Sequence, residues 1–479
     1  MQPRSQKVVP VLTFLCVITC YAYFIHFIGA GSWNAASRLN LTYALAEHGT
    51  FIIDKYHQNT GDKALYNGHY YTDKAPGPSF LAVPFYLVLK LFGVDSEKYI
   101  RYLLSFFVVG LPSALSVFLF LGILKMLDVA NQWLRVVITL SYALGTLAFS
   151  FSTIFYGHQM AATCGIAAFY ILLRLRTNPD QERATYILLS GFLSGLAYLS
   201  DYPAGIIMTL LFAYCLIVVR NKVMGLVWIL GIALPLGTLM YYNTVCFGGP
   251  LASAYTHHVS YNHQSGFMGI GLPKISALWG ITFSPYRGIF YHSPVLLLAL
   301  PGTWLFYRQK QLRTEFWFCS AVVAAFLAFN SGYAYWDGVG TVGARFLVPC
   351  LPFLIILAFR AFIRWPNQAE ILAVLSIFLM MVVCATEPRA PEKMNNPLLY
   401  WNFFNLFKGN LSDNLGRIIG FQDWFSFVPL ALVVTTCFVL IRKSVPVQDL
   451  VRWDKTQAVN SAVLSALVIT WIVGTGLLF

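Results

Sequence analysis

The chain has 479 residues, of which 58% are hydrophobic and 11% are charged. Soluble domains carry roughly 25% charged residues, so this composition excludes a water-soluble protein. Lys and Arg outnumber Asp and Glu by 32 to 19, which gives a net charge of +13. In a soluble protein such an excess would suggest a nucleic-acid partner, but the cytoplasmic loops of membrane proteins also collect Lys and Arg. The sequence therefore predicts an all-α, multi-pass membrane protein with no nucleic-acid partner.

Thirteen apolar runs are broad enough to cross about 30 Å of hydrocarbon. The first follows a short basic segment and has no clear cleavage site, so we interpret it as an uncleaved signal anchor. No linker or low-complexity tract interrupts the rest, and we expect a single membrane domain over residues 1–479. The runs lie at 8–29, 102–126, 136–155, 159–175, 184–200, 204–220, 223–243, 288–306, 315–330, 346–363, 369–385, 425–441 and 458–477.

One further run, 79–92, is about 21 Å long as a helix, which is short for a span and typical of an interfacial helix. The positive-inside rule decides how to interpret it. If 79–92 does not cross, most Lys and Arg residues lie on the side of the N-terminus, whereas a crossing would turn nearly every basic cluster outward. We therefore predict thirteen spans in the plasma (inner) membrane, with a cytoplasmic N-terminus and an outer C-terminus.

This topology gathers the polar, non-repetitive sequence on the outer face. Nearly all of the nine histidines lie in or beside the outer loops. Loops commonly carry binding and catalytic residues, so we expect the active face to be extracytoplasmic. The long outer loops are predicted at 31–101, 244–287 and 386–424, with a shorter one at 331–345.

The first outer loop has three local signals of structure. Apolar residues with helical spacing, from Leu41 to His48, predict a helix on the membrane surface that ends at Gly49. Asn67-Gly68 predicts the turn of a β-hairpin. The Pro and Gly residues of 75–78 then stiffen the chain before the interfacial helix at 79–92.

Three acid-base dipeptides follow one another in this loop: Asp54-Lys55, Asp62-Lys63 and Asp73-Lys74. A lysine can hold a phosphate, and an aspartate within about 3 Å of a hydroxyl can act as a general base. The alternative is a solvated surface ion pair, which we favour for Asp62-Lys63. Asp73-Lys74 precedes the rigid segment and is predicted at the level of a lipid phosphate.

The segment Tyr70-Tyr71-Thr72-Asp73-Lys74-Ala75-Pro76-Gly77 resembles the Tyr-Phe-Glu-Lys-Pro-Pro element of the glycosyltransferase C superfamily, in the bacterial branch of protein O-mannosyltransferases and lipid A aminoarabinose transferases. The long first outer loop and about thirteen spans are also similar, and the resemblance extends weakly to about residue 220. It implies that Lys74 contacts the lipid phosphate. It also implies an enzyme that takes a sugar from a polyprenyl-phosphate carrier and inverts the anomeric centre.

Two features depart from that family. Its members carry an acid just after the first span as the catalytic base, whereas this chain has no acid there until Glu47, and Arg38 is the charged residue of the segment. Asp54 and Asp73 are the substitutes that we predict as catalytic, and Arg38 is a candidate for substrate binding. Related enzymes often carry an acid where this chain has Tyr156-Gly157-His158. His158 is predicted to bind phosphate or act as a base, or to be a tight-turn residue.

Further candidates for substrate binding lie next to the outer ends of spans. Arg287 can bind a phosphate or diphosphate, or it can anchor a helix end. Asp201 lies at the outer mouth between two spans, where an acid is a functional candidate. In the loop 332–345, Trp336 can stack on a sugar, Asp337 can accept hydrogen bonds from its hydroxyls and Arg345 can hold an anion. The alternative for this loop is an interfacial aromatic belt with a glycine-rich turn.

The sequence identifies no certain cofactor and leaves a divalent metal ion open. His257, His258 and His263 fit no standard ligand spacing and have no acid beside them in sequence, so we predict no structural zinc site. No phosphate-binding loop, dinucleotide fingerprint or nucleophile elbow is present in the sequence.

We therefore predict an integral membrane glycosyltransferase of the cell envelope that moves a hexosyl or pentosyl group. Its expected partners are a polyprenyl-phosphate-linked sugar, membrane lipids, and a glycan, lipid or protein acceptor. The alternative is a glycolipid transporter or flippase without transferase activity. A transporter should have charges deep in its spans and symmetry-related repeats, whereas the spans of this chain are nearly free of charge, which favours the enzyme.

Overall fold

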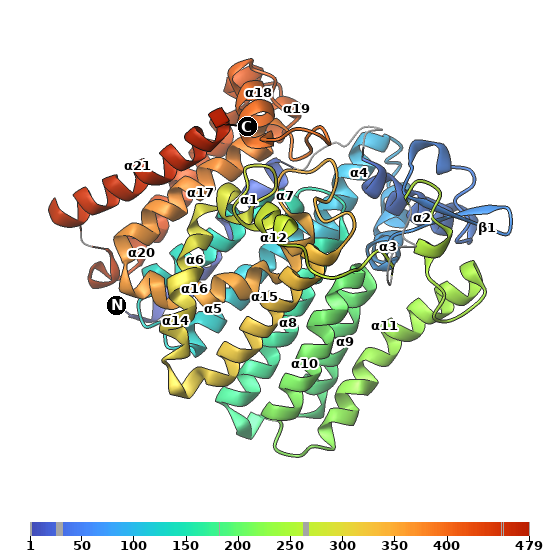
Figure 1. The fold of residues 1–479 in the computed structure, drawn as a ribbon, viewed down its shortest axis with the longest axis horizontal. Helices are drawn as coiled ribbons and strands as arrows, with labels where there is room; N and C mark the ends of the chain where they lie inside the picture. Colours follow the sequence, from blue (N-terminus) through green and yellow to red (C-terminus); the bar gives the residue numbers. More distant parts are fainter. Residues whose placement is uncertain are drawn as a thin grey trace.

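The computed structural model describes residues 2–24, 32–181, 183–261, 268–451, 453 and 455–478. Within these residues the fold is a bundle of helices with one two-stranded antiparallel sheet, which confirms the predicted all-α class (Figure 1). The first half of the chain forms α1 (Gln2–Tyr23), α2 (Trp33–His48), β1 (Lys63–Tyr66), β2 (His69–Thr72), α3 (Gly77–Leu91), α4 (Glu97–Ser105), α5 (Leu111–Met126), α6 (Gln132–Gly145), α7 (Leu147–Ser152), α8 (Gly157–Thr177), α9 (Ala184–Ser200), α10 (Gly205–Val218) and α11 (Met224–Phe247).

The second half is helical as well, with longer connections between several of its helices. It forms α12 (Ile275–Thr282), α13 (Ile289–His292), α14 (Ala299–Tyr307), α15 (Arg313–Gly332), α16 (Leu351–Arg364), α17 (Pro366–Thr386), α18 (Phe404–Phe407), α19 (Leu415–Ile418), α20 (Val428–Ser444) and α21 (Lys455–Leu478). The first helix, α1, packs along α20 from near the other end of the chain. The bundle is therefore closed by elements that are far apart in sequence.

Each predicted apolar run is largely helical in the structure, but the run 136–155 is interrupted at Thr146 and ends as helix at Ser152, and the run 288–306 is interrupted at Ser293. The end of the first run, from residue 25, lies outside the described residues. Eight helical segments of the described chain are long and apolar enough to cross a membrane, and shorter apolar helices accompany them. The protein is therefore a multi-pass membrane protein, while the count of thirteen crossings stays a prediction. The eight segments are Glu97–Met126, Gly157–Thr177, Met224–Phe247, Lys310–Gly332, Arg345–Arg364, Pro366–Thr386, Asp423–Ser444 and Thr456–Thr475.

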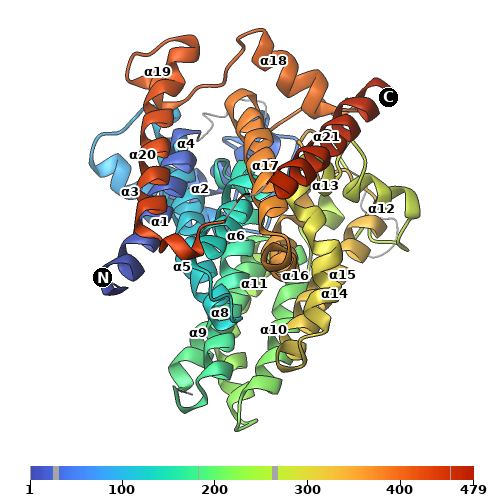
Figure 2. The same cartoon turned by 90° about the vertical axis from the view of Figure 1, so that its left-hand side faces the viewer.

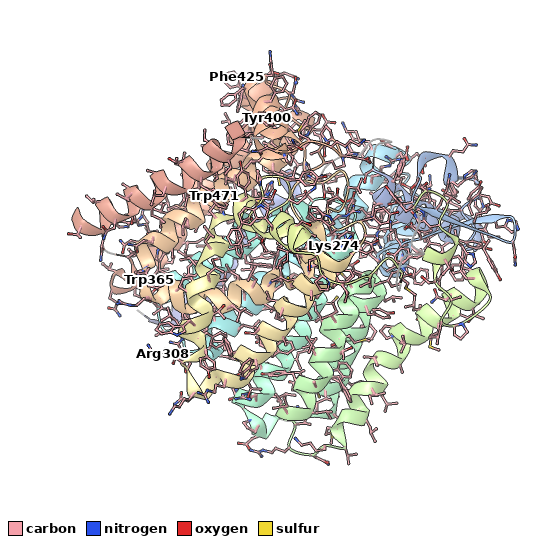
Figure 3. All side chains as sticks on the ribbon, viewed as in Figure 1. Lys274, Arg308, Trp365, Tyr400, Phe425 and Trp471 are labelled. Carbon is pink, nitrogen blue, oxygen red and sulfur yellow. The ribbon has the colours of Figure 1, made fainter. Side chains whose placement is uncertain are left out.

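Different elements lie at the two ends of the bundle. Helices α18 and α19 lie at one end, and the connections from α8 to α9 and from α10 to α11 lie at the other (Figure 2). Figure 3 shows Arg308 near the lower end and Tyr400 near the upper end. The topology predicted from the sequence assigns these residues to opposite sides of the membrane, and which end faces the cytoplasm stays a prediction.

The first predicted outer loop holds α2, the hairpin and α3. Helix α2 ends at Gly49, whose φ of 64° closes the helix as predicted, but it begins at Trp33, well before the expected start. Asn67 and Gly68 have φ values of 50° and 83° and form the predicted hairpin turn, which pairs Tyr66 with His69 and Lys63 with Thr72. The helix expected at 79–92 is present as α3, and its interfacial position stays a prediction.

Helices α9 and α11 pack closely because small residues face each other. A Cβ atom on Gly191 would lie 2.1 Å from the carbonyl oxygen of Trp228, and one on Gly231 would lie 2.2 Å from that of Leu188. Small residues let two helix backbones approach in this way. The contact matters for the site described below, because α11 supplies part of its apolar wall.

Replacing Gly231 with alanine should therefore force α9 and α11 apart and destabilise the protein by about 1–3 kcal/mol. Gly237→Ala is the matched control. Gly237 lies on the same helix, and a Cβ atom there would meet nothing within 4 Å. The measurement is the thermal unfolding midpoint of each variant in detergent. Equal midpoints for the two variants would contradict the close packing.

Candidate functional site

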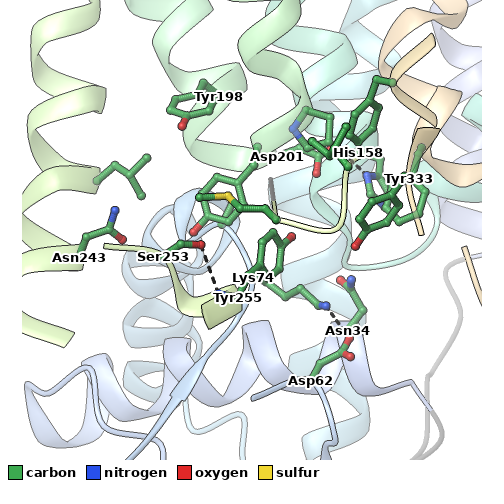
Figure 4. Close-up of a pocket in the computed structure, with 18 of the residues that line it drawn as sticks. Asn34, Asp62, Lys74, His158, Tyr198, Asp201, Asn243, Ser253, Tyr255 and Tyr333 are labelled. Carbon is green, nitrogen blue, oxygen red and sulfur yellow. Dashed lines mark hydrogen bonds and ion pairs between the residues drawn. The ribbon is translucent and has the colours of Figure 1, made fainter. Parts of the chain in front are cut away.

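A cavity of about 370 Å³ opens between the first two predicted outer loops and the ends of the helices beneath them (Figure 4). One wall is polar and carries Lys74, Asp62, Arg345 and the pair His158 and Asp201. The opposite wall is apolar and comes from α10 and α11. Its apolar residues are Ile206, Leu236, Leu239 and Met240. The cavity thus has charged groups on one side and an apolar wall on the other, which suits a ligand with an ionic head and an apolar tail.

Lys74 lies between two buried carboxylates. Its Nζ is 2.7 Å from Oδ2 of Asp73 and 2.9 Å from Oδ2 of Asp62, and its side chain is 13% exposed. The interpretation of Asp62 as a solvated partner of Lys63 is therefore wrong, because Asp62 is buried and Lys63 contacts His57 instead. An ammonium has three N–H donors. Two of these N–H groups face the Asp73 and Asp62 carboxylates, and the third is available to a ligand in the cavity.

His258 fixes Asp73 from the second predicted outer loop. Its Nδ1 accepts hydrogen bonds from the backbone N–H groups of Ser260 and Tyr261, each at 3.0 Å, so its proton is on Nε2. That nitrogen lies 3.2 Å from Oδ2 of Asp73. A bridge between Ala64 and His258 joins the same loop to the hairpin. The two predicted outer loops therefore meet at the Asp73 carboxylate.

The electrostatics of this pair follow from its contacts. Burial alone would raise the pKa of Asp73, but the Lys74 ammonium and the neighbouring His258 imidazole outweigh burial and hold that pKa well below its usual range. Burial alone would lower the pKa of Lys74, but the Asp62 and Asp73 carboxylates outweigh burial and raise that pKa above its usual range. Both groups therefore stay charged across the physiological range.

The contribution of this ion pair to stability should be constant between about pH 5 and pH 9. Because the pKa of Asp73 is depressed, its contribution is present above the unfolded-state value near 3.9 and is lost as pH falls through the lower, folded value. Because the pKa of Lys74 is raised, its contribution is lost only as pH rises through its folded value. The difference in unfolding midpoint between the wild type and Asp73→Asn, measured from pH 3 to pH 10, tests this. A difference that varies steeply near neutral pH would contradict it.

Two arginines from different elements reach the cavity. Arg38 of α2 is 2% exposed, and it donates from Nη1 to the carbonyl oxygen of Ala75 at 2.6 Å and from Nε to Oδ1 of Asn34 at 3.1 Å. Its guanidinium thus holds the backbone just after Lys74. Arg345 lies 5.0 Å from the ring of Phe346 and 6.0 Å from that of Tyr156, and its buried Nε has no hydrogen-bond partner among the described residues. Arg345 therefore has donors left for a ligand.

His158 and Asp201 form a buried pair at the upper ends of α8 and α9. Nδ1 of His158 lies 2.7 Å from Oδ2 of Asp201, and the two residues are 3% and 6% exposed. Gly157 allows this approach, because a Cβ atom there would lie 2.0 Å from the carbonyl oxygen of Ser200. Both side chains line the cavity, as Figure 4 shows.

The other sequence-predicted residues lie outside the cavity lining. Asp54 is 42% exposed and accepts hydrogen bonds from His69 and from the backbone N–H of Tyr70. Arg287 is fully buried and donates from Nε to the carbonyl oxygen of Asp337 at 2.9 Å. Trp336 packs over Gly280, where a Cβ atom would meet its ring at 2.3 Å. Arg287, Asp337 and Trp336 thus join the loop 332–345 to the end of the second predicted outer loop.

The structure adds lining residues that sequence reasoning missed. One of them is Asn34, which is one turn from Arg38 on the same helix. A group of tyrosines also lines the cavity, with ring centroids 5.8 Å apart for Tyr202 and Tyr255 and 5.0 Å apart for Tyr261 and Tyr335. Aromatic rings offer flat apolar surfaces next to hydroxyl groups. Their gathering from separate loops has no signal in the local sequence.

Asp62, Asp73 and His258 form a group whose possible ligand atoms all lie within 4.8 Å of one another. His258 therefore has acids beside it in space, although none is beside it in sequence. Carboxylate and imidazole donors fit a divalent ion, but the position of Lys74 does not, because its Nζ already lies between the two carboxylates. An ion could bind all three groups only if this ammonium moved away.

The chain matches no known family model and no curated protein. Its fold is similar to that of ArnT from Cupriavidus metallidurans bound to undecaprenyl phosphate, with 16% identity and a TM-score of 0.48 over 92% of this chain and 76% of that one. It is also similar to the archaeal oligosaccharyltransferase AglB from Archaeoglobus fulgidus in complex with an inhibitory peptide and a dolichol-phosphate, with 12% identity and a TM-score of 0.42 over 98% of this chain and 56% of that one. The chain thus spans a little over half the length of the archaeal protein.

Proposed function

We propose that the protein is a membrane glycosyltransferase that moves a sugar from a polyprenyl-phosphate donor to an acceptor on the extracytoplasmic face. The observation that carries this proposal is the two-sided cavity, with Lys74 and Arg345 on its polar wall and the apolar residues of α10 and α11 opposite. An anionic head and a long apolar tail are the two parts of a polyprenyl phosphate. The cavity offers a matching surface to each.

In this proposal the phosphate of the donor binds between Arg345 and the third N–H of Lys74. When the bond from the anomeric carbon to the phosphate oxygen breaks, the electron pair stays on the leaving polyprenyl phosphate. Preorganised donors that face such developing charge are an effective source of rate enhancement. Arg38 positions the backbone at Ala75, and Asp62 and Asp73 hold the Lys74 side chain in place.

The sugar is assigned to the part of the cavity lined by tyrosines. Tyr333 and Tyr335 have ring centroids 5.9 Å apart and come from the loop that also carries Arg345. A sugar ring stacked there would lie next to the phosphate to which it is joined. A hexosyl and a pentosyl donor both fit this description, and the acceptor can be a glycan, a lipid or a protein.

Reconstitution tests the proposed function directly. The purified protein is placed in liposomes with radiolabelled polyprenyl-phosphate sugars and extracts that contain glycan, lipid and protein acceptors. We expect label to move from the prenyl carrier to an acceptor. Movement of the intact labelled lipid across the bilayer without transfer would instead identify a flippase, and no transfer from any donor would contradict the proposal.

A further inference from the structure

His158 has one nitrogen that its protein surroundings leave unused. Nδ1 contacts the Asp201 carboxylate at 2.7 Å, so Nδ1 carries a proton and Nε2 carries the lone pair of a neutral imidazole. Nε2 is buried and has no hydrogen-bond partner among the residues that the structure describes. The rings of Phe151, Tyr156 and Phe346 lie around the imidazole at centroid distances of 5.8, 6.1 and 5.5 Å. The ring is therefore fixed in orientation, with its basic nitrogen unoccupied.

The charged groups around this imidazole are Asp201, Arg345 and Arg38. Asp201 is the one in hydrogen-bond contact, and it places a carboxylate beside the ring. A phosphate bound to His158 would have to approach that carboxylate, whereas Arg345 offers a phosphate donors that no described carboxylate occupies. The surroundings thus favour a base at His158 over an anion-binding cation.

The carboxylates near the cavity are already engaged. Asp62 and Asp73 both contact the Lys74 ammonium, and a carboxylate held against an ammonium is a poor proton acceptor. Asp201 contacts His158. At the start of α2, the polar residue that lines the cavity is Asn34, and an amide cannot take a proton at neutral pH. A base in this cavity is therefore best supplied by an imidazole.

We propose that His158 is the general base of the transfer reaction and that Asp201 is its positioning residue, an inference that rests on the proposed function. Nε2 of His158 takes the proton from the acceptor hydroxyl as the hydroxyl oxygen bonds to the anomeric carbon. The bond from that carbon to the donor phosphate breaks, and its electron pair leaves with the polyprenyl phosphate. Asp201 stabilises the imidazolium that forms and keeps Nδ1 protonated throughout.

The first experiment compares His158→Ala with the wild type in the liposome transfer assay. We expect the transfer rate to fall by about 10²–10⁴-fold, while binding of a polyprenyl phosphate without sugar changes by less than about 3-fold. Added imidazole should restore part of the rate, because it can take the proton from the space that the side chain leaves. His48→Gln is the control, since His48 is 41% exposed and lies outside the cavity lining.

The pH profile supplies a readout that a purely structural role would not change. The wild-type rate should rise with pH as the imidazole loses its proton, and this step should be absent from His158→Ala without imidazole. With imidazole analogues of different basicity, the restored rate should follow the pKa of the added base. Asp201→Asn should lower the rate and shift the step, because the amide no longer stabilises the imidazolium.

The outcomes separate this inference from the proposed function. A wild type that transfers no sugar from any donor would overturn both. A wild type that transfers sugar, together with a His158→Ala variant of near wild-type rate, would overturn the base alone. The base would also be overturned if His158→Ala lost its binding of polyprenyl phosphate or gained no rate from imidazole, because His158 would then be a phosphate ligand or a structural residue.

Discussion

Lys74→Met should reduce sugar transfer by at least about 10²-fold, because in the proposed function it removes a donor to the departing phosphate. The same substitution should also destabilise the protein by about 3–5 kcal/mol, since it leaves the Asp62 and Asp73 carboxylates buried without their cation. The two effects are measured as the transfer rate in liposomes and the unfolding midpoint in detergent. Lys55→Met is the control, because Lys55 is 64% exposed.

A double variant separates the two effects. Adding Asp62→Asn to Lys74→Met removes one of the two uncompensated carboxylates and should recover part of the lost stability. It should not recover transfer, because the donor to the phosphate is still missing. If the double variant regained both stability and transfer, Lys74 would be a structural residue and the proposed phosphate site would be wrong.

Arg345→Gln should weaken binding of a polyprenyl phosphate by about 10–100-fold, which is the range for one or two charge-assisted hydrogen bonds. Its effect on stability should be small, within about 1 kcal/mol, because Arg345 has ring contacts but no described carboxylate partner. Arg345→Gln should thus lower binding without a large loss of stability, whereas Lys74→Met should lower both transfer and stability. A radiolabelled prenyl phosphate and the unfolding midpoint provide the two measurements.

The matched control for Arg345 is Arg308→Gln. Arg308 also lies over an aromatic ring, 4.3 Å from the centroid of Trp304, but it is exposed near the end of the bundle opposite to Tyr400 (Figure 3). The Arg308→Gln substitution should leave binding of the polyprenyl phosphate unchanged. If Arg345→Gln were strongly destabilising yet bound the lipid normally, the assignment of Arg345 to the phosphate would fail.

Local sequence signals predict local structure well in this chain. The turn at Asn67-Gly68 and the end of α2 at Gly49 both require left-handed backbone, and both residue types favour it. The apolar runs coincide with helices because burial in lipid demands long apolar segments whose backbone bonds are satisfied internally. The early start of α2 was missed, because Ser32 is its N-cap and the helix it opens is too polar to show the apolar spacing used to find it.

The pairing of Asp62 with Lys74 was within reach of the sequence. In the two-residue hairpin, Lys63 pairs with Thr72, so Asp62 and Asp73 are the next residues opposite each other. Two facing carboxylates need a cation, and Lys74 follows at once. The position of Asp62 next to Lys63 in the sequence does not reveal this register, which is why the predicted pairing of Asp62 with Lys63 is wrong.

Contacts between distant loops could not be predicted in the same way. His258 reaches Asp73 across more than one hundred and eighty residues, and its Nδ1 is fixed by backbone groups of its own loop. Likewise, Arg287 contacts the backbone carbonyl of Asp337, and residue type alone does not specify such a partner. A charged residue at the end of a span has the same sequence signal whether it binds a ligand or holds a loop. These positions depend on tertiary packing.

The charges at the cavity have a consequence for which anions it retains. Three cations, Arg38, Lys74 and Arg345, are accompanied by three carboxylates, Asp62, Asp73 and Asp201, so that the pocket and its immediate supports have no formal net charge. A neutral group of this kind attracts small anions only weakly over long distances. Inorganic phosphate and soluble nucleotides would gain little there, because they cannot use the apolar wall of α11. In the proposed function, selection against water-soluble phosphates would follow from this internal neutralisation together with the apolar wall.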